Sequence, residues 1–296
     1  MINKDIEHSL NLLKNRYSCR QFSSRRIEDD VLNEILQVGI RAASGGNLQP
    51  VTVIMIRDQS KKDKIRELCW QGFIADADTL LVYLLDYHRL NSWATVQQAP
   101  FGKQYSFTDF VISMEDVMCV AQSIECAATL LGVGSVYIGT VNYVYDELKE
   151  LLNLPPLTIP VVMSCLGYSK SDNEEIHLQG HLRRKLSQEV VVHNESYQPI
   201  SDETVKEEIV ASKYQNWLQK MSGEVLEKYK AELFEVAKDV NGEEYAAEVV
   251  KRIEEQQGIN RAQFRLGYHY NPVRLREHNK NVLRFYKQQG FDFWSE

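Results

Sequence analysis

Three short runs of apolar and β-branched residues constrain the fold of this 296-residue chain more than any other feature. They occupy residues 51–56, 80–85 and 159–166, and a shorter run follows the same pattern at 135–138. Runs of this length and composition predict strands that are buried on both faces of a sheet. Helical patterns lie between them. The chain is therefore expected to form a central mixed sheet between layers of helices.

The helical patterns differ in character along the chain. Residues 3–14 and about 29–41 predict amphipathic helices. The longest pattern covers 110–131 and is apolar on most sides, which predicts a central helix. Residues 90–110 show little periodicity and are expected to form a loop or irregular cover. The Gly-Val-Gly sequence at 132–134 follows a helix and precedes a strand, so it is not a dinucleotide-binding fingerprint.

The composition changes after residue 197. Residues 202–256 are charged and helical in pattern, an aromatic and basic stretch follows near 264–274, and a last helix is expected near 282–289. The sequence therefore predicts two domains, a core at residues 1–200 and a helical C-terminal extension at 201–296. The charged helices either present solvated faces or form a dimer arm or an active-site cover.

Charge and hydropathy exclude several classes of function. The net charge of -7 disfavours nucleic-acid binding, which selects for excess Lys and Arg. No apolar run approaches the roughly 20 residues that span a bilayer, so no membrane association is expected. Asp5 and Glu7 stand where a secretory or organellar signal would exclude acids, and the protein is expected to be cytoplasmic.

The sequence also lacks the residue patterns that are typical of metal sites and of nucleophilic active sites. The five cysteines are widely spaced without a CxxC pair, so neither a disulfide framework nor a zinc site is expected. His177 and His181 lie four residues apart without a further obvious ligand, and no metal is expected there. No Ser/His/Asp or Cys/His arrangement is evident, so no catalytic residue is predicted.

Two basic clusters have the spacing of a phosphate site. In the motif Arg-Tyr-Ser-Cys-Arg at residues 16–20, Arg16, Ser18 and Arg20 alternate, so in an extended segment they share one face. Guanidinium groups offer paired N–H donors that fit phosphate oxygens. Arg183 and Lys185 repeat the spacing downstream. Each cluster alone is also compatible with a basic surface strand.

A turn rich in small residues lies between these clusters. Residues 43–50 read Ala-Ser-Gly-Gly-Asn-Leu-Gln-Pro. Glycine lets the backbone approach a planar ring closely. The side chains of Asn47 and Gln49 both donate and accept hydrogen bonds, which suits the mixed edge of a flavin pyrimidine ring. Taken alone, the turn is also compatible with a simple helix stop before a strand.

In this order, the motifs resemble the FMN-dependent nitroreductase family, and within it the branch of oxygen-insensitive NADPH nitroreductases and flavin reductases. The resemblance extends from residue 16 to about residue 197. Besides the motifs above, it includes Gln71, Asp86 with Arg89 nearby, the Gly-rich passage at 131–139, and the segments 165–168, 183–185 and 192–197.

The resemblance implies an α+β fold, a three-layer sandwich with a central mixed sheet. It also implies an intertwined homodimer with FMN at the subunit interface. The residues it implies for the phosphate and the adjacent ribityl chain are Arg16, Ser18, Arg20 and Lys185. Those it implies for the ring or the ribityl oxygens are Ser44, Asn47, Gln49, Gln71, Tyr137, Ile138 and Gly139. It places Arg183 by the pyrimidine edge, although which cation serves phosphate and which serves the ring stays open.

The resemblance also implies an oxidoreductase activity. NADPH or NADH would pass hydride to flavin N5 and leave, and a nitroaromatic, a quinone or a free flavin would then take the electrons, in a ping-pong sequence. The alternative is a flavin-binding or flavin-delivery protein without substantial turnover. The segment 167–183 and the helical region 205–270 are longer than in the family, so the physiological acceptor and the preferred nicotinamide stay open.

Overall fold

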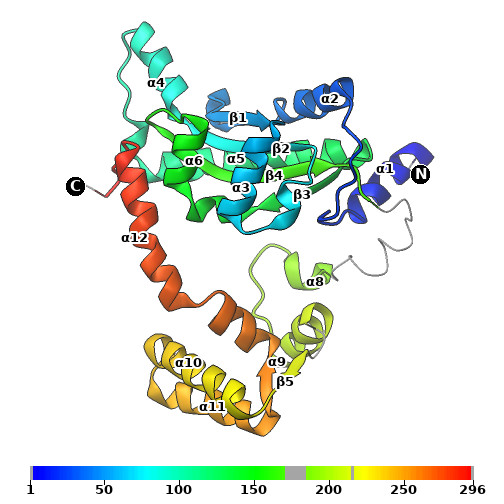
Figure 1. Ribbon diagram of the computed structural model, residues 1–296, viewed down its shortest axis with the longest axis vertical. Helices are drawn as coiled ribbons and strands as arrows, with labels where there is room; N and C mark the ends of the chain where they lie inside the picture. Colours follow the sequence, from blue (N-terminus) through cyan, green and yellow to red (C-terminus); the bar gives the residue numbers. More distant parts are fainter. Residues whose placement is uncertain (1–2, 171–184, 215–216, 295–296) are drawn as a thin grey trace. The chain divides into compact units, whose positions relative to one another are not determined.

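The computed structural model describes residues 3–170, 185–214 and 217–294 (Figure 1). The chain divides into two compact units. The first combines Met1–Leu182 with Val282–Glu296, and the second is Arg183–Asn281. In this division, residues 282–294 group with the first unit. The predicted boundary at residue 200 stays a prediction. The expected arm or cover function of residues 201–296 stays a prediction.

A four-stranded sheet forms the centre of the first unit. Its strands are β1 (Val51–Ile56), β2 (Thr79–Asp86), β3 (Gly134–Ile138) and β4 (Thr158–Gly167), in the order β1-β2-β4-β3. All three pairings are antiparallel, and an isolated parallel bridge joins Ser18 to Ser135 at the β3 edge. The four predicted strand runs are thus confirmed. β2 and β4 are buried along their whole length, as their apolar runs predict.

Helices cover both faces of this sheet, which gives the predicted α+β three-layer sandwich. Successive side chains of a strand point to opposite faces. Leu81, Tyr83 and Leu85 of β2 pack in a cluster with α2 (Asp29–Gly39) and α5 (Phe107–Leu130). Leu80, Val82 and Leu84 pack in a second cluster with α3 (Gln59–Cys69) and α6 (Tyr145–Leu152).

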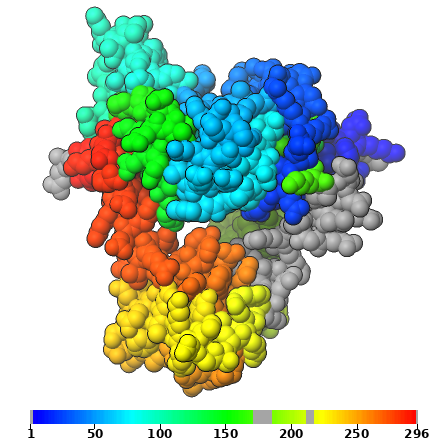
Figure 2. Space-filling view, in the orientation of Figure 1, coloured from blue at the N-terminus to red at the C-terminus, as the bar shows by residue number. Residues whose placement is uncertain are grey.

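The expectation of a loop at residues 90–110 is partly wrong. Residues Tyr87–Val96 form α4, and a short 3-10 helix follows at Lys103–Tyr105. Asp86 accepts a hydrogen bond from the Arg89 N–H and so caps α4. The helix stands out from the rest of the first unit (Figures 1 and 2). Its Trp93 and Val96 are exposed. Because few of its side chains are buried, its apolar periodicity is weak.

The second unit is mainly helical, which confirms the helical pattern of residues 202–256. Its core cluster contains Leu226, Leu233, Ile253 and Ile259. Its elements are α8 (Gln188–Val191), α9 (Asp202–Thr204), a π-helix (Val205–Tyr214), β5 (Leu218–Lys220), α10 (Gly223–Asn241), α11 (Glu243–Gln256), β6 (Gly258–Asn260), a second π-helix (Gln263–His269) and most of α12 (Pro272–Gln288). Across residues 3–170, 185–214 and 217–294, no helix is long and apolar enough to cross a membrane.

The C-terminal residues are part of the core of the first unit. Phe285, near the end of α12, is 1% exposed and stacks on Tyr145 with ring centroids 4.6 Å apart. Gln289 is fully buried, and its Nε2 donates to the carbonyl oxygens of Thr158 and Pro155 at 2.7 and 3.0 Å. These contacts fasten residues 282–294 to the region where β4 begins.

Candidate flavin site

The segment that carries the first basic motif lies along the β3 edge of the sheet. The Cys19 N–H donates to the Ser135 carbonyl at 2.9 Å, beside the bridge between Ser18 and Ser135. Four residues further on, the Ser23 N–H donates to the Tyr168 carbonyl at 2.8 Å. The segment is thus extended, as the alternating pattern requires, and it follows α1 (Lys4–Lys14).

The two arginines of this motif have different surroundings. Arg16 lies within 2.9 Å of the Glu125 carboxylate on α5, measured from Nη2 to Oε1, and its side chain is 28% exposed. Arg20 is exposed, and its Nη1 lies 3.4 Å from the Ser18 carbonyl. The structure therefore places one guanidinium against a buried carboxylate and the other at the surface.

At the end of β3, the buried hydroxyl of Tyr137 is followed closely by the exposed backbone of Gly139. The Tyr137 hydroxyl is buried without a hydrogen-bond partner among the described residues. Burial, and then the nearby Glu125 and Tyr83, raise the pKa of Tyr137 far above its ordinary value. Ile138 packs into the cluster on the opposite face of the sheet. Gly139 is exposed, and a Cβ there would meet no described atom within 4 Å.

The side chain of Gln71 also lies at the end of β3. Its Nε2 donates to the Thr140 hydroxyl at 3.0 Å, next to Gly139. The structure thus brings five predicted site positions to one edge of the sheet. They are Arg16, Ser18, Gln71, Tyr137 and Gly139.

The small-residue turn is a strained and internally bonded structure. Gly46, Asn47 and Gln49 have φ angles of 58°, 53° and 51°, a region that non-glycine residues rarely adopt. The Ser44 hydroxyl accepts from the Gln49 N–H at 3.1 Å, and Gln49 Nε2 donates to Asn47 Oδ1 at 3.2 Å. These bonds hold the polar side chains of the turn in one group.

The turn lies at the opposite edge of the sheet from the first group. It leads directly into β1, whereas Gly139 follows β3, and β2 and β4 lie between these strands. Three inter-strand spacings of about 4.8 Å separate the two edges by about 14 Å. Within one chain the structure therefore does not bring Ser44, Asn47 and Gln49 together with Arg16 and Gly139.

The positions of Arg183 and Lys185 relative to the β3-edge residues and to the turn are not given by the structure. Arg183 lies outside the described residues. Lys185 is described and exposed, but it belongs to the second unit. The predicted contribution of both cations to the site stays a prediction.

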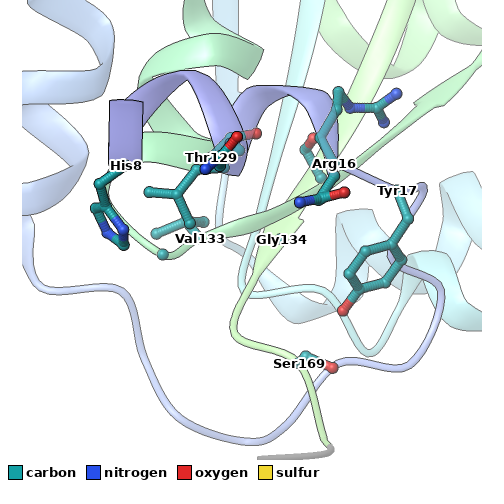
Figure 3. A pocket seen from close by; sticks show the side chains of 12 residues that line it. His8, Arg16, Tyr17, Thr129, Val133, Gly134 and Ser169 are labelled. Atoms are coloured by element: carbon teal, nitrogen blue, oxygen red, sulfur yellow. The ribbon is translucent and has the colours of Figure 1, made fainter. Parts of the chain in front are cut away.

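A pocket of about 340 Å³ opens between α1 and the start of β3 (Figure 3). Of the predicted site residues that the structure describes, Arg16 alone lines it. The Tyr17 hydroxyl points toward Ser169 across the pocket, and His8 lies at its other end (Figure 3). The pocket therefore extends the surface beside the basic motif toward α1.

Sequence reasoning missed two acidic residues that organise these groups. Glu125 holds Arg16, and Asp116 accepts a hydrogen bond from the Gly45 N–H at 2.9 Å. Both lie on α5 and are at most 7% exposed. The available signal was the presence of acids within an otherwise apolar helical pattern, because buried carboxylates need partners.

These features agree with the comparison to protein families. Residues 13–168 match the model of the nitroreductase family. That match covers more than half of the chain, and the chain belongs to this family.

Individual relatives share the fold and much of the length. A protein from Staphylococcus saprophyticus named NADPH-dependent oxidoreductase is 29% identical over 206 residues, which is 68% of this chain and 79% of that protein. NfrA2 of B. megaterium is 26% identical, with a TM-score of 0.70 over 97% of this chain and 99% of its own. The NADPH:FMN oxidoreductase of Vibrio harveyi, solved with NAD+, is 26% identical, with a TM-score of 0.60 over 67% and 82%.

Proposed function

We propose that this chain is an FMN-dependent oxidoreductase that takes electrons from NADPH or NADH and passes them to a small planar acceptor. A nitroaromatic compound, a quinone and a free flavin are the acceptor classes. One observation carries the proposal: the phosphate-type motif at residues 16–20 lies along β3, which ends at the exposed backbone of Gly139 beside Gln71. Family membership and the names of the relatives above support it.

The chemistry of the described residues fits FMN. Arg16 and Arg20 supply charge and N–H donors for a phosphate. The buried Arg16 Nε and Tyr137 hydroxyl have no partner among the described residues, so both retain hydrogen-bonding capacity. The open backbone at Gly139 permits close approach of a flat ring. Bound FMN would supply the hydride-accepting and electron-donating chemistry.

We further propose that the functional unit is a homodimer, in which each site takes residues from both copies. The separation of the turn from the β3 edge supports this, because one chain alone provides only part of the site. The turn is bonded to α5 through Asp116, and Ile112 of α5 lies next to Gly45. Val111, Ile112 and Met118 of the same helix are exposed. An apolar surface of this kind is typical of subunit interfaces.

Each group of residues then has a separate task. Arg16, Ser18 and Arg20 bind the phosphate, with Lys185 as a further cation. Gln71 and, from the second copy, Asn47 and Gln49 bind the polar edge of the ring and the ribityl oxygens. No side chain is assigned a proton-transfer step.

Steady-state kinetics tests the proposal. Purified protein supplied with FMN should oxidise NADPH or NADH continuously when menadione or nitrofurazone is present, and anaerobic mixing with the nicotinamide alone should reduce one equivalent of FMN. Reduction without continued turnover would indicate a flavin-binding or flavin-delivery protein instead. Failure to bind FMN would contradict both.

A further inference from the structure

Glu125 is a buried acid near the C-terminal end of the long central helix α5. Its side chain is 4% exposed, and its neighbours Ile124 and Ala128 belong to the apolar core. Moving a carboxylate out of water is costly unless charge and hydrogen bonds compensate it. The position therefore requires a specific set of partners.

Three side chains from three parts of the fold provide these partners. Arg16 Nη2 lies 2.9 Å from Glu125 Oε1, and the Ser135 hydroxyl donates to the same oxygen at 3.2 Å. Gln122 Nε2 donates to Oε2 at 3.0 Å from one turn earlier on α5. Both carboxylate oxygens are thereby bonded, and the carboxylate has one defined orientation.

This arrangement fixes the basic motif from two sides. Glu125 holds the side chain of Arg16 directly. It also bonds Ser135, whose carbonyl accepts the Cys19 N–H and whose backbone is bridged to Ser18. One carboxylate thus connects the start of the motif, its middle and the strand that leads to Gly139. The contact uses Nη2 of the guanidinium, and the Nε of Arg16 has no hydrogen-bond partner among the described residues.

We propose that Glu125 is a positioning residue for the flavin phosphate, acting through Arg16. This inference rests on the proposed function, in which the motif at residues 16–20 binds the phosphate of FMN. Glu125 holds the Arg16 side chain in one orientation before the ligand arrives, so binding does not have to order it. An immobilised long side chain accounts for about a 3- to 10-fold difference in affinity.

The opposite outcome has an equally clear physical basis. A carboxylate near a phosphate repels it, so a purely electrostatic contribution of Glu125 would weaken FMN binding. Removing the charge in Glu125→Gln would then strengthen binding. The direction of the change therefore separates positioning from simple charge compensation.

The experiment compares FMN with riboflavin, which has the same ring and ribityl chain but no phosphate. Dissociation constants are measured by flavin fluorescence quenching for the wild type, Glu125→Gln, Arg16→Ala and the double variant. We expect Glu125→Gln to weaken FMN about 3- to 10-fold and riboflavin less than about twofold. In the Arg16→Ala background, Glu125→Gln should cause no further change, because its effect passes through Arg16.

Two further variants distinguish a specific loss of phosphate binding from a general loss of folding. Gln122→Ala removes a donor from an exposed position and should weaken FMN selectively by a smaller factor, again only when Arg16 is present. Asp78→Asn disrupts the partly buried ion pair of Asp78 with Arg57, at 3.0 Å, outside the proposed site. It should leave the ratio of FMN to riboflavin affinity unchanged even if it lowers thermal stability.

The outcomes separate the inference from the proposed function. A wild-type protein that binds no FMN overturns the proposed function and this inference with it. A wild type that binds FMN overturns the inference alone if Glu125→Gln tightens FMN, weakens both flavins equally, or has the same effect with and without Arg16.

Discussion

The backbone N–H of Gly45 donates a hydrogen bond to Oδ1 of Asp116, 2.9 Å away, across 71 positions of sequence. Asp116 is 7% exposed and lies on the central helix α5. This bond fastens a turn that contains strained, left-handed residues to the long central helix of the first unit. The turn that carries Asn47 and Gln49 is therefore bonded to α5 as well as within itself.

Removal of the Asp116 carboxylate should loosen this turn. Asp116→Ala leaves the Gly45 N–H without its partner, and we expect the free energy of unfolding to fall by about 1–3 kcal/mol in urea titrations. FMN affinity should fall as well. Glu115→Ala, at the neighbouring exposed position, is the control and should change the unfolding free energy by less than about 0.5 kcal/mol. Equal losses in the two variants would argue against this role of the bond.

Substitution of Arg20 should weaken FMN binding without harming the fold. Arg20 is exposed, so Arg20→Ala removes a charged phosphate partner without opening a cavity. A hydrogen bond to a charged group is worth about 1.5–3 kcal/mol, or roughly 10- to 150-fold in affinity. Riboflavin binding should change little. Arg26→Ala, an exposed arginine outside the site, matches the change in charge, and if it weakened FMN equally the effect would be general electrostatics.

Mixed dimers test whether each site takes residues from two chains. We expect Arg20→Ala and Gln49→Ala homodimers both to bind FMN weakly. In a dimer with one chain of each kind, one site carries both changes and the other carries neither, so about half of the sites should bind FMN with wild-type affinity. Differently tagged chains allow the mixed dimer to be purified and titrated with FMN. Weak binding at every site of the mixed dimer would contradict a shared site.

The C-terminal residues should contribute strongly to stability. Phe285 is 1% exposed and stacks on Tyr145, so Phe285→Ala creates a cavity and should lower the unfolding free energy by about 3–5 kcal/mol. Leu283→Ala, two residues earlier and 47% exposed, should cost less than about 1 kcal/mol. Urea unfolding followed by circular dichroism measures both. A small loss for Phe285→Ala would mean that this segment is not part of the core.

A buried tyrosine should make the protein less stable at high pH. Burial raises the pKa of Tyr87 to about 12, and nearby Asp109 and Asp116 add to the shift. The unfolded tyrosine loses its proton near pH 10, so the contribution of Tyr87 is complete below that pH and is lost as pH rises toward about 12. The unfolding free energy of Tyr87→Phe should fall less steeply across this window than that of the wild type. Parallel slopes would contradict the assignment.

Much of the fold was predictable because it depends on local patterns. The strands at 51–56, 80–85, 135–138 and 159–166 are apolar runs bounded by turns, and the structure confirms all four. The helix α4 was missed because it protrudes and buries little. The return of residues 282–294 to the core was missed because a short apolar pattern does not reveal which surface it covers.

The candidate site shows the same limit. The alternation of Arg16, Ser18 and Arg20 indicated an extended basic segment, which the structure confirms. Which predicted site residues lie near one another depends on the order of the strands in the sheet. This order places the turn and Gly139 at opposite edges. Glu125 and Asp116 act through contacts 109 and 71 positions distant, to Arg16 and Gly45 respectively, and no local pattern specifies such contacts.

The visible absorption spectrum of the purified protein, before and after anaerobic addition of NADPH, tests the central claim most directly. We expect protein that is incubated with FMN and freed of excess ligand to retain about one flavin per chain, with bands at ~370 and ~450 nm. NADPH or NADH should then bleach the longer-wavelength band. A protein that remains colourless after incubation with FMN would contradict the central claim.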